Sequence, residues 1–423
     1  MADIQDQLAE LRRRIARINR KWAEPPKTAP PPPPLWQEDK PSRYFIEELM
    51  SGEVVRTPLG EHFETEKLWD RARRHGSMGV ADLPDLPHDL LHALSAGEAP
   101  ASPPERWAFL DTETTGLAGG TGTYAFLIGV GSIGPDGFRL RQFFMRDYGE
   151  EASLLHRLAE HLSEFDVLIT YNGKTYDQPL LETRYRMARS RPPFARMAHL
   201  DLLFGARRLW KLRLESCRLI ELEHRILGVE RHGDLPGELI PYYYFDYLRN
   251  KQAFKLVPIF HHNAIDILSL ACLTAIVPFA FRSPEEAPLR HGSDFIGLGR
   301  WLTQTGREEE GLRLMRRAVD LGLPDDLLFR TLWDVGCLAK RLGHSAAAVA
   351  TFTDLAASRN PYRVRAYGEL AKHYERRERN YTMALEMTRS ALDLQESAEM
   401  RRREERLKLR LAAPKKKAAR LFS

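Results

Sequence analysis

The sequence is poor in cysteine and has no long uninterrupted apolar segment. Its three cysteines, Cys217, Cys272 and Cys337, are widely separated, and their spacing fits neither a zinc-binding motif nor a disulfide framework. The lack of an apolar run of about 18 residues gives no indication of a membrane span, and the acidic first residues argue against a signal peptide. We therefore expect a cytoplasmic protein that keeps its cysteines reduced.

Length and composition predict a globular protein of more than one domain. The chain has 423 residues, of which 43% are hydrophobic and 29% are charged, as is typical of soluble proteins. Changes in composition divide the chain into five parts. These are an N-terminal helix with a proline-rich spacer (1–35), a lead-in segment with a linker (36–104), an α/β domain (105–282), helical repeats (283–400) and a basic tail (401–423).

The α/β domain is expected because strand-like and helix-like patterns alternate after residue 105. Three strands in hairpin order are followed by a helix, a strand, a second helix and a fifth strand. A strongly apolar helix from about Pro258 to Phe279 closes the region. This order predicts a mixed five-stranded sheet with flanking helices. The expected strands are 107–110, 124–133, 138–145, 167–171 and 199–204.

The last third of the chain contains three similar segments at an offset of about 36 residues. They begin at Leu302, Ala339 and His373, and the third looks most like a tetratricopeptide repeat. Three helical hairpins are about the minimum that buries a continuous core. We therefore expect an all-α, tetratricopeptide-like domain that offers a surface to a protein partner.

Basic residues are concentrated between Arg184 and Arg213, where nine arginines and lysines accompany one acid, Asp201. Such a stripe suits a polyanion, so Arg207 and Arg208 are candidates for nucleic-acid binding, although a solvated helical face has the same pattern. The interleaved aromatic residues that offer stacking are Tyr185, Phe204 and Trp210.

Two acids, Asp111 and Glu113, follow an apolar strand-like segment. In an extended chain, residues i and i+2 point to the same face, so both carboxylates project together. Two like charges on one face repel unless a cation lies between them, and a divalent metal ion is the obvious candidate. Many strands end in an exposed acid pair, so a metal site needs further ligands elsewhere in the chain.

Two later segments supply candidates for these ligands. Asp177 begins a predicted helix after a strand, where a carboxylate reaches the sheet edge but where a capping Asp is equally common. In the apolar helix, His262 and Asp266 are four residues apart and share a face, whereas His261 lies off that face. Burying such a pair without a metal ion or a charge partner is costly, although a buried His–Asp pair can be purely structural.

Together these segments resemble the DEDD family of 3′–5′ exonucleases. Asp111-Thr-Glu-Thr-Thr-Gly-Leu117 is similar to the first family motif, Asn172-Gly-Lys-Thr-Tyr-Asp177 to the second and His261-His-Asn-Ala-Ile-Asp266 to the third. From about residue 40 to 390, the chain looks like the YprB-type branch, which has trailing tetratricopeptide-like helices. The resemblance implies a ribonuclease-H-like fold for the α/β domain.

The resemblance also implies a two-metal mechanism that uses Mg²⁺ or Mn²⁺. In this family pattern, Asp111 would bridge the two ions, Glu113 and Asp266 would complete the coordination of one, and Asp177 would support the second.

A histidine would act as general base on the attacking water, because its pKa is near neutral. The spacing in the histidine-type exonucleases selects His261. The spacing in the tyrosine-type relatives and in the closer branch selects His262, which is slightly favoured.

The resemblance further suggests residues that meet nucleic acid. Thr114 and Leu117 match positions that contact the terminal nucleotide, although a simple turn has the same pattern. Asn172, which is expected to hold the loop before the second acid, and Tyr176 lie in the second motif and are further candidates. Asp201 could be an extra metal ligand but is better explained as a strand-end residue.

The favoured function is a metal-dependent 3′–5′ exonuclease that hydrolyses phosphodiester bonds of single-stranded or 3′-end nucleic acid. The alternatives are a structure-selective endonuclease on the same fold and a non-catalytic scaffold that binds nucleic acid while its repeats bind a protein. No residue that would recognise a 2′-hydroxyl group is identifiable, so the choice between DNA and RNA stays open.

Overall fold

The computed structural model describes residues 13, 44–95, 97–116, 122–231 and 233–412, which form two compact units. The described residues of Met1–Leu202 and Arg218–Ala275 belong to the first unit, and those of Leu203–Cys217 and Ile276–Ser423 belong to the second. The predicted N-terminal helix and proline-rich spacer lie outside the described residues, apart from the single residue 13. The lysine-rich end of the predicted tail lies outside them too.

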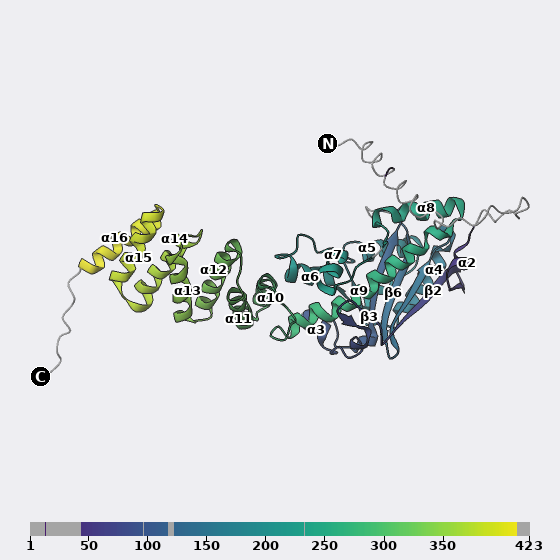
Figure 1. The fold of residues 1–423 in the computed structure, drawn as a ribbon, viewed down its shortest axis with the longest axis horizontal. Coiled ribbons are helices and arrows are strands. Elements are labelled where there is room, and N and C mark those ends of the chain that lie inside the picture. Colours follow the sequence, from purple (N-terminus) through teal and green to yellow (C-terminus); the bar gives the residue numbers. More distant parts are fainter. Residues whose placement is uncertain (1–12, 14–43, 96, 117–121, 232, 413–423) are drawn as a thin grey trace, which may run out of the picture. The chain divides into compact units, whose positions relative to one another are not determined.

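Within the described residues of the first unit, a mixed sheet of seven strands forms the centre (Figure 1). The strand order is β1-β2-β7-β6-β5-β8-β9, in which β5, β8 and β9 run parallel and the other neighbours run antiparallel. All five strands predicted from the sequence are present, as β5 to β9, but the last one ends at Asp201, and the predicted strand residues 202–204 begin helix α6 (Leu202–Trp210) instead. The seven strands are β1 (Glu53–Thr57), β2 (Gly60–Asp70), β5 (Trp107–Thr114), β6 (Ala125–Gly134), β7 (Gly137–Phe144), β8 (Val167–Thr170) and β9 (Ala198–Asp201).

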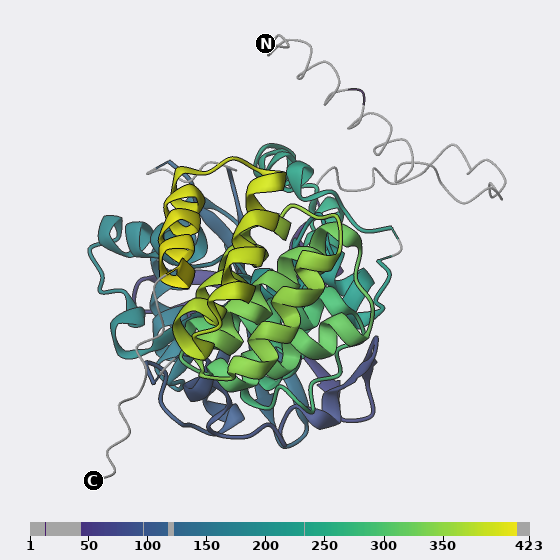
Figure 2. The same cartoon turned by 90° about the vertical axis from the view of Figure 1, so that its left-hand side faces the viewer.

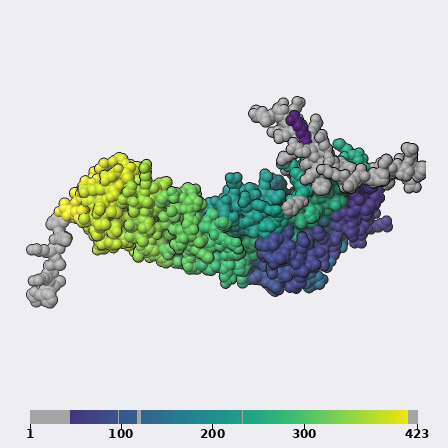
Figure 3. Space-filling view, viewed as in Figure 1, coloured from purple at the N-terminus to yellow at the C-terminus, as the bar shows by residue number. Residues whose placement is uncertain are grey.

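The two additional strands come from the lead-in segment, so the expected number of five strands is too small. β1 and β2 form a hairpin, and β2 pairs with β7 from Phe63 opposite Phe144 to Asp70 opposite Gly137. The charged residues along β2 conceal its strand character in the sequence. The purple and blue residues of this segment therefore form one body with teal residues of the same unit (Figure 3). A short hairpin, β3 (Arg74–His75) and β4 (Met78–Gly79), follows β2.

Helix α9 (Val257–Arg282) lies against one face of the sheet because β6 has glycines at the contact. A Cβ atom on Gly129 would collide with Asn263 Oδ1, and one on Gly131 would lie 2.6 Å from Ile267 Cγ2. The two glycines therefore allow the helix to approach the backbone of the strand closely.

Helices α4 (Glu151–Leu162) and α5 (Asp177–Met187) pack on the opposite face. Ser153 of α4 hydrogen-bonds His62 of β2 at 2.9 Å, and the Tyr185 hydroxyl of α5 donates to the Leu155 carbonyl of α4 at 2.8 Å. The two predicted helices before and after β8 are therefore confirmed. The other helices of this unit are α2 (Ile46–Leu49), α3 (Leu90–Leu94), α7 (Leu219–Leu222) and α8 (Ile240–Asn250).

The segment Ala253–Arg282, which contains α9, is long and apolar enough to cross a membrane by length and composition alone, with a mean hydropathy of 2.1. However, 72% of its apolar window is buried inside the protein, as in a core helix. Histidines and an acid interrupt the segment, so the sequence contains no uninterrupted apolar run of this length.

The second unit is entirely helical in its described residues. Consecutive helices pack as three antiparallel pairs, α10 with α11, α12 with α13 and α14 with α15, drawn in green to yellow in Figure 2. The tetratricopeptide assignment stays a prediction. The first part of the predicted basic tail forms α16, which packs on α15. These helices are α6 (Leu202–Trp210), α10 (Gly292–Gln304), α11 (Glu308–Asp320), α12 (Asp325–Arg341), α13 (Ser345–Ala357), α14 (Arg363–His373), α15 (Tyr381–Leu394) and α16 (Ala398–Ala412).

Candidate active site

Asp111 and Glu113 lie on the C-terminal half of β5 and face the side of the sheet that α9 covers. Asp111 is opposite Gly129 and Glu113 is opposite Leu127 of β6, so the two carboxylates share a face, as their spacing predicts. Asn263 of α9 donates from Nδ2 to Asp111 Oδ2 at 2.9 Å and to its carbonyl oxygen at 3.2 Å. This amide therefore ties the first motif to the third.

Glu113 is buried and Asp111 is half-buried, and the positive charge of Arg231 offsets only part of the repulsion that Asp111 receives from neighbouring acids. Burial, followed by the negative charges of Asp266 and Asp177, raises the pKa of Asp111 well above its usual range. Burial and the charge of Asp111 do the same to the pKa of Glu113, which is only 8% exposed. In the part of the chain that the structure describes, neither carboxylate forms an ion pair. The pair is thus poised to accept a positive charge.

Asp177 is the first residue of α5 and reaches β5 from the other face of the sheet. The Thr112 hydroxyl donates to Asp177 Oδ1 at 2.6 Å. Burial raises the pKa of Asp177 to about 6, although this hydrogen bond opposes the shift. Because Thr112 alternates with Asp111 and Glu113 along the strand, the acids approach the end of β5 from two sides.

The two adjacent histidines of α9 point to different surroundings. His262 Nδ1 lies 2.9 Å from Asp234 Oδ1, and His262 Nε2 lies 3.8 Å from Asp266 Oδ2. His261 is exposed and lines a separate cavity. Geometry therefore associates His262, and not His261, with the acids.

Sequence reasoning missed a cationic residue and two acids in the connection between α7 and α8. Arg231 ion-pairs with Asp266 and with Glu223, and its Nη1 lies 3.0 Å from Asp234 Oδ2. Burial opposes ionisation of Asp234, but hydrogen bonding to His262 and the charges of His262 and Arg231 lower its pKa to about 2. The residues have no periodic pattern, and they lie some 30 residues before the helix that they contact, so no sequence signal marked them.

The four acids of the three motifs, Asp111, Glu113, Asp177 and Asp266, have the oxygen donors of a divalent cation site. Their side chains do not, however, surround a common point. Among the described residues, no group of three or more His, Cys, Asp or Glu side chains is arranged to hold a metal ion. Asp266, one of the four expected ligands, pairs with Arg231 instead. Buried carboxylate oxygens that lack a cation nevertheless fit Mg²⁺ or Mn²⁺, which prefer oxygen ligands.

The candidate nucleotide contacts of the first motif are only partly described. The Thr114 hydroxyl donates to the Gly116 carbonyl at 2.8 Å and so stabilises a turn. Leu117 lies outside the described residues.

In the second motif, Asn172 adopts a left-handed backbone conformation with φ of 68°, and its N–H donates to Asp201 Oδ1 at 2.8 Å. Asp201 Oδ2 also accepts from the Lys174 N–H at 3.1 Å. Asp201 therefore anchors the loop that leads to Asp177, as its strand-end position suggests. Tyr176, directly before Asp177, is 54% exposed and presents its ring to solvent.

The basic stripe is not a continuous free surface. Arg184 pairs with Glu151 at 2.5 Å and Arg213 with Asp294 at 2.8 Å. The expectation that Tyr185 and Trp210 offer stacking surfaces is wrong, because both are buried core residues. Phe204, Arg207 and Arg208 are exposed on α6 and remain available for contact.

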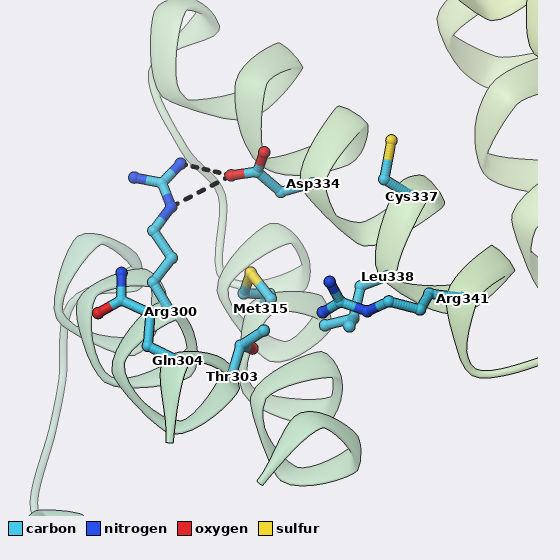
Figure 4. Close-up of a pocket in the computed structure, with 8 residues that line it drawn as sticks. All are labelled: Arg300, Thr303, Gln304, Met315, Asp334, Cys337, Leu338 and Arg341. Atoms are coloured by element: carbon cyan, nitrogen blue, oxygen red, sulfur yellow. Dashed lines mark hydrogen bonds and ion pairs between the residues drawn. The ribbon is translucent and has the colours of Figure 1, made fainter. Parts of the chain in front are cut away.

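A second cavity, of about 310 Å³, lies within the helical unit between α10, α11 and α12 (Figure 4). Arg300 on its wall is paired with Asp334 at 2.7 Å, as the dashed lines show, and Arg341 is paired with Glu308 at 2.9 Å. Partial burial raises the pKa of the Cys337 thiol. The cavity therefore offers neither an unpaired arginine nor an activated nucleophile among these side chains.

Two comparisons with known proteins agree with this architecture. Residues 108–277 match a family model described as the RNase_H superfamily, and this span runs from β5 into α9. The chain is also 32% identical over 356 residues to the uncharacterized protein YprB of Bacillus subtilis (strain 168). That alignment covers 82% of this chain and 84% of the relative.

Proposed function

This chain belongs to the YprB family and has an RNase H-like domain, and we propose that it is a metal-dependent 3′–5′ exonuclease. The fold indicates a nuclease that acts on nucleic acid. One observation supports the metal-dependent part of this proposal: the buried Glu113 and Asp177 and the half-buried Asp111 lie around the end of one strand, and none of them forms an ion pair in the described part of the chain. Uncompensated carboxylates of this kind are costly to stability and are typical of functional sites. The 3′–5′ exonuclease activity is proposed from the resemblance of the three motifs.

The residues that would hold two Mg²⁺ or Mn²⁺ ions are Asp111, Glu113, Asp177 and Asp266, the last through Oδ2, because Arg231 occupies its Oδ1. When bound, such ions supply an activated water and neutralise the charge of the phosphate transition state. Asn263 keeps the Asp111 carboxylate in place through its hydrogen bond, and Thr112 does the same for Asp177.

His262 is the proposed general base. Because the charged Asp234 accepts a hydrogen bond from Nδ1–H, the other ring nitrogen, Nε2, is left free to take a proton. Arg231 holds Asp234 and Asp266 on either side of this ring. His261 points away from the acids and is not assigned this role.

The test uses the full chain with 5′-labelled single-stranded DNA and RNA, each in linear and circular form, with Mg²⁺, Mn²⁺ or EDTA. A ladder that shortens from the 3′ end of linear strands, with circles left intact, is expected. Asp111→Asn should abolish the ladder, and Asp136→Asn, at an exposed turn, serves as the matched control.

Each alternative has its own outcome in this assay. Cleavage of circles would replace the exonuclease with an endonuclease, and binding of strands without cleavage under any condition would leave only a scaffold. His262→Ala should lose turnover, whereas His261→Ala should keep kcat; the opposite result would reassign the base.

A further inference from the structure

A cavity of about 410 Å³ adjoins the acid site on the side of His261. Its walls come from β3, from the connection after Leu227 and from the first turns of α9. Two hydrogen bonds join these walls: the Ser77 N–H donates to the Leu227 carbonyl at 2.7 Å, and His75 Nε2 lies 2.7 Å from Ser269 Oγ. β3 accordingly lies beside α9 in Figure 1.

The cavity shares side chains with the acid site. Arg231 and Asp234 line it, and the same two residues contact Asp266 and His262 on their other sides. The cavity and the pair of His262 and Asp266 therefore lie on two sides of the same two side chains.

The lining combines an apolar wall with a polar rim. Val229 and Ile265 contribute the apolar side, and Arg73, Glu230 and His261 contribute polar groups. Arg73 is exposed and forms no ion pair in the described part of the chain. Its positive charge is therefore available to an anion. Ligand pockets of roughly 300–1,000 Å³ with mostly apolar walls and a few polar groups are typical of small-molecule sites.

We propose that this cavity, the His261 pocket, binds one nucleotide of the substrate strand. The base packs against Val229 and Ile265, and the phosphate meets Arg73 and His261. Glu230 places a carboxylate at the rim, which repels a bare anion but can accept a hydrogen bond from a base amino group. This inference rests on the proposed nuclease function and gives the strand a second point of attachment beside the acids.

The pocket also gives the adjacent histidines separate tasks. Neighbouring residues on a helix point about 100° apart, so one histidine can face the acids while the next faces the pocket. Partial desolvation, followed by the positive charge of Lys67, lowers the pKa of His261, so its ring is a neutral hydrogen-bonding group at neutral pH. A neutral imidazole has one N–H group, which can donate a hydrogen bond to a phosphate oxygen.

The first experiment measures binding of the four nucleoside 5′-monophosphates and of inorganic phosphate to the full chain by calorimetry in EDTA. Nucleotides are expected to bind, and His261→Ala and Arg73→Ala should each weaken binding at least tenfold. Arg71→Ala is the matched control. Arg71 lies with Arg73 in the connection between β2 and β3, but its guanidinium donates to the Pro135 carbonyl at 3.4 Å. Melting temperatures of all variants establish that they fold.

The outcomes separate this inference from the nuclease proposal. Phosphate binding as tight as nucleotide binding, no saturable nucleotide binding, or equal loss in Arg71→Ala would overturn the pocket. On linear strands, His261→Ala and Arg73→Ala should raise KM with kcat retained; unchanged KM would overturn the pocket while leaving the nuclease. Nucleotide binding by a chain that cleaves nothing would retain the pocket and overturn the nuclease.

Discussion

Buried acids occur in both units, but their surroundings differ. In the first unit, Asp111 and Glu113 face further acids, and their pKa values are raised well above the usual range. In the second unit, Glu375 is also buried, yet Arg406 lies 2.9 Å and Arg403 3.3 Å from its carboxylate. Burial opposes ionisation there, but these arginines lower the pKa of Glu375.

The comparison distinguishes a paired acid, which stabilises the fold, from unpaired acids, which do not. Glu375 links α14 and its extension to α16 through its arginines, so its charge contributes to packing. Among the described residues, Asp111 and Glu113 form no ion pair with an arginine, and they are retained in spite of their cost. Glu375 follows the rule that a buried acid pairs with a cation, whereas Asp111 and Glu113 do not. Function is expected at such an exception.

The largest expected effect comes from exchanging one acid in each unit for its amide. Asp111→Asn should lower the rate of hydrolysis by about 1,000-fold because a proposed metal ligand is lost. The free energy of unfolding should not fall, because a buried charge is removed. Glu375→Gln should leave the rate within about twofold and weaken the fold, since Arg403 then loses its buried counter-charge and keeps only the exposed Glu399 at 3.5 Å. Steady-state rates and urea unfolding measure both, and a large loss of stability in Asp111→Asn would contradict the comparison.

The second effect concerns the cation that holds the site together. Arg231→Ala leaves Glu223, Asp234 and Asp266 without their common partner, so the free energy of unfolding should fall by about 3–5 kcal/mol. Arg225→Ala removes only an exposed pair with Glu221 and should cost less than about 1 kcal/mol. Urea unfolding compares the two, and similar losses would show that Arg231 is not a structural element of the site.

The third effect is a pH dependence of opposite sign to that of an ordinary paired acid. The pKa of Asp177 is raised to about 6, so the folded state binds more protons than the unfolded state between about pH 4 and 6. In EDTA, the free energy of unfolding should therefore fall as pH rises through this window, by up to about 3 kcal/mol from this group. The difference between wild type and Asp177→Asn, measured by urea unfolding at each pH, isolates it; a flat difference would refute the shift.

The smallest effect is expected on the exposed arginines of α6. Replacing Arg207 and Arg208 with Ala should reduce the slope of log affinity against log salt for single-stranded nucleic acid by about 1.4, because up to two phosphate contacts are lost. Arg330→Ala, at an exposed position of α12, should leave the slope unchanged. Fluorescence anisotropy at several salt concentrations measures this slope. An unchanged slope in the double variant would show that Arg207 and Arg208 do not contact nucleic acid.

Much of the first unit follows from the sequence because its signals are local. The i, i+2 spacing placed Asp111 and Glu113 on one face, and helical periodicity located α5 and α9. The hairpin of β1 and β2 was missed because charged residues interrupt its alternation, although the strand is stabilised by pairing with β7.

The contacts that the sequence did not predict depend on segments far apart in the chain. Arg231 and Asp234 gain their roles only when their connection folds against α9. The choice between His261 and His262 likewise depends on which ring faces Asp234, which spacing cannot tell. Tyr185 and Trp210 show the opposite error, since aromatic residues within a basic stretch can belong to the core.

The glycines of β6 fix how far apart the two halves of the site lie. Where α9 crosses β6, it packs on bare backbone at Gly129 and Gly131, beside the neighbouring strand that carries Asp111. Backbone has no rotamers, so this separation does not vary with side-chain motion and cannot be readjusted by repacking. Alanine at Gly129 would act as a wedge that moves Asn263 and its helix outward. Such a protein would retain every reacting group and still be unable to bring them together.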